Sequence, residues 1–254
     1  MPDFRCFAPH AAAGESRITL SPEESRHLVR VNRARTGAEV SVFDGRGNEW
    51  VCELVSTGKE AVLETRTHAV LPPPPCPVIL AQALPKGKTM DQIVRKATEL
   101  GVAEIVPLLT ARTEVRLDAA RGETKTDKWE QTAVEAAKQS GNSRLPVIAP
   151  VQSLSDWLAA ARLPDLRLVG SLHPGARHLR SVVDELRSAN AFPPSSAGWV
   201  IGPEGDLTPE EMEALLSAGC KPVTFGRAVL RCDTAAITAL GILHYELEAP
   251  IWAK

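Results

Sequence analysis

Two hydrophobic patterns divide the chain, and a proline-rich stretch separates them. In the first part, apolar and polar positions alternate over Glu39–Phe43 and Glu49–Val55, which predicts strands with one buried face. The Asp44-Gly45 pair between them favours a tight turn. The stretch Leu71–Pro77 contains five prolines and favours an extended spacer. After it, continuous apolar runs alternate with amphipathic segments, which predicts buried parallel strands joined by helices.

The first part is predicted to be a small β-rich domain with one helix. A third strand is expected over Ala61–Thr65. The segment Ser21-Pro-Glu-Glu24 has a cap residue, a proline at the first helical position and a glutamate at the third. This is the pattern of a capping box at a helix start.

Strands and helices are predicted to alternate through the second part. The predicted strands are Val78–Leu84, Glu104–Leu109, Pro146–Pro150, Leu166–Leu172, Trp199–Ile201 and Pro222–Phe225. The predicted helices are Thr89–Leu100, Thr126–Ser140, Ser153–Ala161, His178–Ala189, Thr208–Ala218 and Thr234–Glu248. This order is typical of an α/β fold, in which helices cover both faces of a mostly parallel sheet.

Composition narrows the class of protein. The 254 residues include 29 Lys and Arg against 31 Asp and Glu, and the net charge of −2 excludes a uniformly basic nucleic-acid binder. The five cysteines are odd in number and have no CxxC spacing, which argues against a disulfide framework and a zinc site. No apolar run has the length of a membrane span, and the first residues lack the apolar core of a signal peptide. We therefore expect a soluble, reduced, cytoplasmic protein without a metal or a membrane contact.

Three loops that follow predicted strands are candidates for a ligand site. They are the glycine- and proline-containing segments Leu168–Gly175, Ile201–Asp206 and Phe225–Ala235. Each alone is an ordinary turn, but the carboxyl ends of parallel strands are where α/β sheets bind ligands. Together they indicate one composite pocket. The chain has no GxSxG or HExxH motif, so a nucleophilic triad and a metalloprotease site are not indicated.

One arginine in the third loop stands at an unexpected position. Arg231 precedes a predicted helix, where the helix dipole disfavours a cation. Asp233 or Thr234 is expected to cap that helix. Because the helix gains nothing from Arg231, we interpret this residue as serving a ligand or a reaction.

A second candidate feature is a basic segment. Arg26, His27, Arg30, Arg33 and Arg35 occur within ten residues without a carboxylate. The spacing of i, i+4 and i+7 would place three arginines on one stripe of a helix that persists this far. Such a stripe is often only a solvated face, but in an acidic protein it favours contact with phosphates.

The last predicted helix is apolar over more than one stripe. Core packing explains one face, and an interface between two subunits would explain the rest.

Several motifs occur in order along essentially the whole chain. They are His27-Leu-Val-Arg-Val, Phe43-Asp-Gly, Ala83-Leu-Pro-Lys-Gly-Lys-Thr-Met-Asp, Lys96-Ala-Thr-Glu-Leu-Gly-Val102, Gln139-Ser-Gly, Arg144-Leu-Pro146, Ile201-Gly-Pro-Glu-Gly205 and Gly226-Arg-Ala-Val-Leu-Arg-Cys-Asp-Thr-Ala235. In this combination the chain resembles the RsmE family of 16S rRNA uridine-N3 methyltransferases.

The resemblance implies a fold, a cofactor and a partner. Residues 1–72 would be a PUA-like β-barrel that binds RNA, and residues 73–254 a SPOUT-type domain with a trefoil knot. The family acts as a homodimer and methylates one uridine of 16S rRNA in the assembled 30S subunit. The three loops would bind S-adenosylmethionine, with contacts expected at Leu172, His173, Ile201, Gly202, Pro203, Glu204, Gly205, Gly226, Leu230, Arg231, Thr234 and Ala235.

Roles for charged residues follow from the resemblance and the basic segment together. Arg231 is the expected catalytic residue, which would stabilise negative charge on a uracil carbonyl oxygen. The general base stays open between Glu204, Asp233 and water. Contacts to RNA are expected from Arg5, His27, Arg30, Arg33, Lys86, Arg112 and Arg144.

The chain departs from the family pattern at four positions. Asp206 replaces the last glycine of GPEGG, Asn142 a usual arginine, Lys138 a common glutamate, and Asn32 a common leucine. Two other classes of function stay open. A non-catalytic rRNA-binding or assembly factor would need no cofactor, and a small-molecule enzyme would not depend on RNA.

Overall fold

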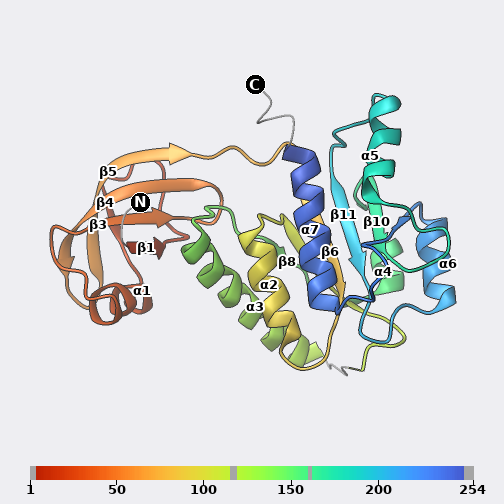
Figure 1. Ribbon diagram of the computed structural model, residues 1–254. Coiled ribbons are helices and arrows are strands. Elements are labelled where there is room, and N and C mark those ends of the chain that lie inside the picture. The colour runs from red at the N-terminus through yellow and green to blue at the C-terminus, as the bar shows by residue number, and fades with distance from the viewer. Residues whose placement is uncertain (1–3, 115–118, 160–161, 249–254) are drawn as a thin grey trace. The chain divides into compact units, whose positions relative to one another are not determined.

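The computed structural model describes residues 4–114, 119–159 and 162–248. The chain folds into two compact units. Unit 1 comprises Met1–Pro73 together with Val134–Leu145, and unit 2 comprises Pro74–Ala133 and Pro146–Lys254. The two units therefore separate first within the proline-rich stretch that the sequence singles out, and unit 1 also takes up a later segment (Figure 1).

Unit 1 is built on a five-stranded sheet with the order β1-β3-β4-β5-β2. The pair β1 and β3 is parallel, and the other neighbours are antiparallel. The predicted hairpin and third strand are present and longer than expected, whereas β1 and β2 are too short for their pattern to predict. The strands are β1 (Phe4–Phe7), β2 (Arg17–Thr19), β3 (Glu39–Phe43), β4 (Asn48–Thr57) and β5 (Ala61–Val70).

The helix of unit 1 begins as predicted but does not continue as an α-helix. Helix α1 (Pro22–Arg26) starts where the Ser21 side chain accepts a hydrogen bond from the Glu24 backbone N–H, at 3.2 Å. It then widens into the π-helix η1 (His27–Val31). The expected i, i+4, i+7 stripe is wrong, because the π-helix changes the angular spacing and Arg33 lies beyond it with φ of 58°.

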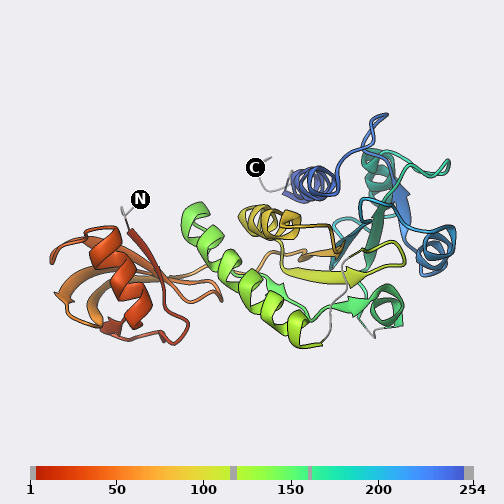
Figure 2. The same ribbon diagram turned by 90° about the horizontal axis from the view of Figure 1, so that it is seen from below.

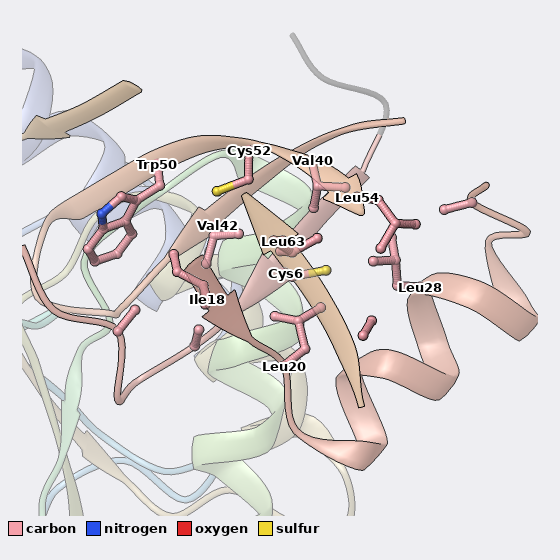
Figure 3. Packing of buried hydrophobic residues seen from close by; sticks show 14 residues of the cluster. Cys6, Ile18, Leu20, Leu28, Val40, Val42, Trp50, Cys52, Leu54 and Leu63 are labelled. Atoms are coloured by element: carbon pink, nitrogen blue, oxygen red, sulfur yellow. The ribbon is translucent and has the colours of Figure 1, made fainter. Parts of the chain in front are cut away.

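The core of unit 1 comes from alternating positions of the sheet and from the helix (Figure 3). Val40 and Val42 on β3, Trp50 and Cys52 on β4, and Leu28 on η1 are fully buried. The sulfur atoms of Cys6 and Cys52 lie within this apolar cluster (Figure 3). Burial raises the pKa of the Cys52 thiol to about 11, so this cysteine is a core residue and not a reactive thiol.

Unit 2 is built on a parallel sheet with the order β12-β10-β11-β6-β7-β8, and the short β9 also pairs with β7. Each predicted strand is present within a few residues of its expected bounds. The strands are β6 (Val78–Ala83), β7 (Glu104–Leu109), β8 (Val147–Ile148), β9 (Gln152–Ser153), β10 (Leu166–Gly170), β11 (Ala197–Ile201) and β12 (Lys221–Val223).

Helices of unit 2 cover both faces of this sheet (Figure 2). On one face, α7 packs against β6 and β11, and α2 lies beside α7. On the other face, Trp157 of α4 and Leu215 of α6 bury a cluster with Val106, Val169 and Val200. The helices are α2 (Thr89–Glu99), α4 (Leu154–Ala159), α5 (Leu179–Ser188), α6 (Pro209–Ser217) and α7 (Cys232–Glu248). Helix α3 (Ala119–Ser140) begins in unit 2, and its last residues, from Val134, belong to unit 1.

Two predicted helices differ from the structure at one end. Helix α3 begins seven residues before the predicted start at Thr126, in a charged segment without an apolar pattern. The helix predicted over Ser153–Ala161 is α4, and its predicted last residues, Ala160 and Ala161, lie outside the described residues. Of the described helices, none combines the length and apolarity needed to cross a membrane.

Candidate functional site

Three neighbouring strands bring the three candidate loops to one edge of the sheet. Strand β10 lies between β12 and β11, and all three run parallel. They end at Gly170, Ile201 and Val223, so the loops that follow them start side by side. Residues of all three loops form the walls of one cavity of about 340 Å³. This is the composite pocket that the parallel order predicts.

The loop after β11 forms part of the cavity wall. Ile201, Gly202, Pro203 and Glu204 all line it. The loop closes by a hydrogen bond of 2.9 Å from the backbone N–H of Asp206 to the carbonyl of Pro203. Helix α6 then starts with the predicted capping box, in which the Thr208 and Glu211 side chains accept from each other's backbone N–H groups.

Asp206, which departs from the family pattern, occupies a conformation that explains the usual glycine. Its φ is 62°, in the left-handed region that favours glycine. Aspartate tolerates this region better than most residues, because its side chain bonds to nearby backbone. Here its Oδ1 accepts a hydrogen bond of 2.8 Å from the Leu207 N–H. The substitution therefore keeps the turn and adds a carboxylate to the cavity wall.

Two further loops hold the loop after β11 in place. Arg112, after β7, donates from Nη1 to the carbonyl oxygens of Gly205 and Leu207, at 2.8 and 3.3 Å. The backbone N–H of Lys86, after β6, donates to the Glu204 carboxylate at 3.0 Å. Arg112 and Lys86, for which the sequence predicts RNA contacts, position the loop that lines the cavity.

The loop before α7 forms another part of the cavity wall. The Thr224 hydroxyl bonds to both backbone groups of Gly226, which has φ of 120°. The Phe225 ring packs on Trp199, with 5.3 Å between ring centroids. It also fills the space beside Gly170, where an added Cβ would lie 2.8 Å from the ring. Glycine at position 170 is therefore a packing requirement of this wall.

Arg231 lies in the cavity wall and points largely to solvent. Its side chain is 81% exposed, and its Nε lies 3.5 Å from Oδ1 of Asp233. Helix α7 begins at Cys232, so the expectation that Asp233 or Thr234 caps it is wrong. The Arg231 carbonyl instead accepts from the Ala235 N–H. The cation is thus at the helix start, as predicted, beside a carboxylate of the first turn.

The structure gathers most of the residues that were expected to bind the cofactor. The cavity is lined by Leu172, Ile201, Gly202, Pro203, Glu204, Leu230, Arg231 and Ala235. His173, Gly205, Gly226 and Thr234 are in the same loops but do not line it. The sequence reasoning missed Gly170, Ser171, Asp206, Phe225, Ala228, Val229 and Cys232, which also line it. All seven stand within the three candidate loops, so the sequence located the loops but did not show which of their residues line the cavity.

The basic side chains of unit 1 divide into exposed and internal groups. His27, Arg30 and Arg33 are exposed on and after η1, as binding to a phosphate backbone would need. Arg5 is different, because its side chain is only 13% exposed and pairs with Glu49. Arg144 donates to the backbone carbonyls of Leu71 and Pro72, so it fastens the end of β5 within unit 1.

Neither a thiol nucleophile nor a metal cluster emerges from the described residues. Burial raises the pKa of Cys232 in the cavity wall to about 11, which keeps its thiol protonated at neutral pH. Across the described ranges, no group of three or more His, Cys, Asp or Glu side chains is arranged to hold a metal ion.

Family models match both parts of the chain. The model of an RNA methyltransferase domain matches residues 72–244, and that of an RNA methyltransferase PUA domain matches residues 20–64.

Named relatives match over most of this chain as well. Ribosomal RNA small subunit methyltransferase E of Synechocystis is 32% identical over 92% of this chain and 75% of its own. The enzyme of the same name from Bacillus subtilis is 31% identical over 91% of both chains. The crystal structure of ribosomal RNA small subunit methyltransferase E from Neisseria gonorrhoeae, bound to S-adenosylmethionine, is 27% identical over 96% of this chain and 97% of its own, with a TM-score of 0.84.

These matches agree with the geometry of both units. The parallel sheet with its three-loop cavity is the SPOUT-type methyltransferase fold, and the smaller β-rich unit contains the PUA-like domain. The chain belongs to the RsmE family of ribosomal RNA small subunit methyltransferases.

Proposed function

We propose that this protein transfers a methyl group from S-adenosylmethionine to N3 of a specific uridine in 16S rRNA, within the 30S subunit. The observation that carries the proposal is the cavity that the loops after β10, β11 and β12 build together. The printed names of the relatives support the ribosomal RNA substrate, and the cofactor bound to the Neisseria gonorrhoeae enzyme supports the methyl donor.

The residues of the cavity fit S-adenosylmethionine. Its volume of about 340 Å³ lies within the range of small-molecule sites. Leu172, Phe225 and Leu230 offer apolar walls to a purine ring, and Glu204 and Asp206 offer negative charge to a cationic ligand. When bound, this cofactor supplies a methyl group on a positively charged sulfur, which is already an activated leaving group.

The chain's own residues then have two tasks, alignment and charge stabilisation. N3 of the uracil must be held close to and in line with the methyl carbon. As the imide loses its proton, negative charge develops on the carbonyl oxygens, and the Arg231 guanidinium in the cavity wall would stabilise it. The proton acceptor stays open between Glu204, Asp233 and water.

The two domains would divide the work. Residues 1–72 would grip the RNA backbone through the exposed His27, Arg30 and Arg33, and residues 73–254 would hold the cofactor and perform the transfer. The exposed basic segment is far in sequence from the cavity loops, which is consistent with separate binding and chemical roles.

Further family properties complete the proposal. The SPOUT-type domain would carry a trefoil knot, and the protein would act in the cytoplasm as a homodimer. The apolar helix α7 supports a subunit interface, because its Tyr245 side chain is 70% exposed in the single chain.

The test is incubation of the protein and cofactor with small ribosomal subunits that lack the modification, followed by reverse transcription. A methyl group on N3 blocks the Watson–Crick edge of uracil, so transcription should stop at one uridine. Subunits that bind the protein but give no stop would contradict the proposal and favour a non-catalytic binding factor. Turnover of a small molecule without RNA would favour a small-molecule enzyme.

A further inference from the structure

A second cavity of about 580 Å³ adjoins the first one in unit 2. The two cavities share Ser171, Leu172 and Asp206 in their walls. The remaining walls of the second cavity come from Arg112 and from one side of helix α6. A ligand in the second cavity would therefore lie next to a cofactor in the first, along these shared walls.

The walls of the second cavity combine apolar surfaces with polar edges. Met212 and Leu216 stand four residues apart on α6 and share one face of the helix. Leu172 is 53% exposed although it is a large apolar residue, so a ring in the cavity would cover it. Ser171 and Thr208 add hydroxyl groups. Flat apolar contact with hydrogen-bonding groups at the edge suits a heterocyclic base.

Arg112 adds a positive charge to this wall. Its Nη1 is held by the carbonyl oxygens of Gly205 and Leu207, which orients the whole planar guanidinium. A guanidinium has five N–H donors, so these two bonds leave other donors of the group for a ligand. A base whose carbonyl oxygens gain negative charge on losing the imide proton suits such a cation.

We infer that the second cavity receives the target pyrimidine base, turned out of the RNA, while the first cavity holds the cofactor. The inference rests on the proposed methylation, because it names where the substrate of that reaction binds. Methyl transfer needs the two reacting atoms about 3–3.5 Å apart, which two adjoining cavities with shared walls permit. Ser171, Leu172 and Asp206 would then border both reactants, and the edge of the base that carries N3 would face the first cavity, whose wall contains Arg231.

The test fills the second cavity without touching the first. Glu213 is exposed and lines the second cavity only, so Glu213→Trp places a bulky ring there at little cost to folding. Ala214 is also exposed on α6 but lines neither cavity, so Ala214→Trp is the matched control. Thermal unfolding of both variants checks that each is folded.

Three measurements on the full chain test whether the second cavity binds the target base. For Glu213→Trp we expect cofactor affinity by calorimetry within about twofold of the wild type, and affinity for small subunits within a few-fold. Single-turnover methylation should fall at least 100-fold, the scale of a misplaced reactant. Ala214→Trp should match the wild type in all three.

Crosslinking supplies a readout that does not depend on activity. Small subunits containing 4-thiouridine, irradiated with the protein and S-adenosylhomocysteine, should attach to peptides that contain Arg112 or residues 206–216. Attachment only to residues 224–231, or full methylation by Glu213→Trp, would overturn the inference. Loss of cofactor binding by this variant would also overturn it, by assigning the cavity to the cofactor. A wild type that binds the cofactor but leaves every subunit unmethylated would instead refute the proposed function.

Discussion

The ion-pair networks inside unit 1 and the cavity of unit 2 use charged side chains in opposite ways. In the networks of unit 1 the charges are buried, as for Lys138 and Glu24, whose side chains are 9% and 13% exposed. In unit 2, the cavity is shaped by loop backbone, and the charged Glu204, Asp206 and Arg231 remain exposed at its walls. Charges that hold a fold must lose water to find partners, whereas charges that meet a ligand must stay accessible.

The network around Arg5 shows the first behaviour most clearly. Its guanidinium bonds to Glu49, to the hydroxyls of Ser41 and Ser143 at 2.8 Å, and to the Gly141 carbonyl at 3.1 Å. Burial alone would raise the pKa of Glu49, but the hydrogen bonds from Arg5, Ser143 and Ser41 hold it below its ordinary value. Arg5, which we predicted to contact RNA, therefore already ties the loop after α3 to the sheet of unit 1.

The Lys138 pair gives a physical reason for a departure from the family pattern. Lys138 replaces a common glutamate and lies between Glu24 and Glu135. Glu24 also accepts from the Phe7 backbone N–H, so its carboxylate is not available to complete the predicted capping box. A glutamate at 138 would face Glu24 in a partly buried site, so the pair in this chain depends on lysine.

The largest expected effect concerns the exposed charges of unit 2. Arg231→Ala should lower the single-turnover methylation rate by about 100- to 1,000-fold, because one donor to a developing negative charge is lost. Cofactor affinity by calorimetry should change little. The control is Arg227→Ala, an exposed arginine of the same loop that does not line the cavity. A parallel loss of both quantities would mean that Arg231 only braces the loop through Asp233.

The next largest effect is expected from breaking a partly buried ion pair of unit 1. Arg5→Ala should lower the free energy of unfolding of unit 1 by about 3 kcal/mol, because Glu49 is left without its cation in a partly buried site. Urea unfolding measures it, with the exposed Arg17→Ala on β2 as control. If Arg5→Ala leaves the stability unchanged but weakens RNA binding, Arg5 contacts RNA and does not stabilise unit 1.

A smaller effect distinguishes the exposed arginines of the basic segment from the paired arginines of unit 1. Replacing Arg30 and Arg33 together with Ala should weaken binding to small subunits. The slope of log affinity against log salt should flatten by roughly 1.5–2, about one per phosphate contact. Exposed Arg66, which pairs with Glu53 on the sheet, should leave the slope unchanged when replaced by Ala. Equal salt slopes for the wild type, the double variant and Arg66→Ala would contradict the assignment of RNA binding to the basic segment.

The smallest effect is a dependence on pH. Because the folded-state pKa of Glu49 is lowered, its carboxylate stabilises unit 1 above the unfolded-state pKa of about 4.5. That contribution should disappear as pH falls through the folded-state value. Urea unfolding at pH 7, 5, 4 and 3 should show the wild type more stable than Glu49→Gln at pH 7, with the difference shrinking below about 4.5. A constant difference would contradict this linkage.

The sequence by itself determined the elements of the sheet and where a site must lie. Apolar runs such as Glu104–Leu109 match β7 residue for residue, since burial on both faces leaves a local pattern. Parallel order alone then predicted that loops after separate strands meet at one edge. The family motifs occur in those loops, so eight of the twelve expected cofactor residues line the cavity.

Only the tertiary structure decided which charged residues are internal and which are free to bind. Arg5 and Ser143 are 138 positions apart, and no local pattern announces such a pair. The same holds for Arg112 and Gly205, which are 93 positions apart. Hydrophobic periodicity is a property of neighbouring residues, whereas the partner of a charge depends on how the whole chain folds back on itself.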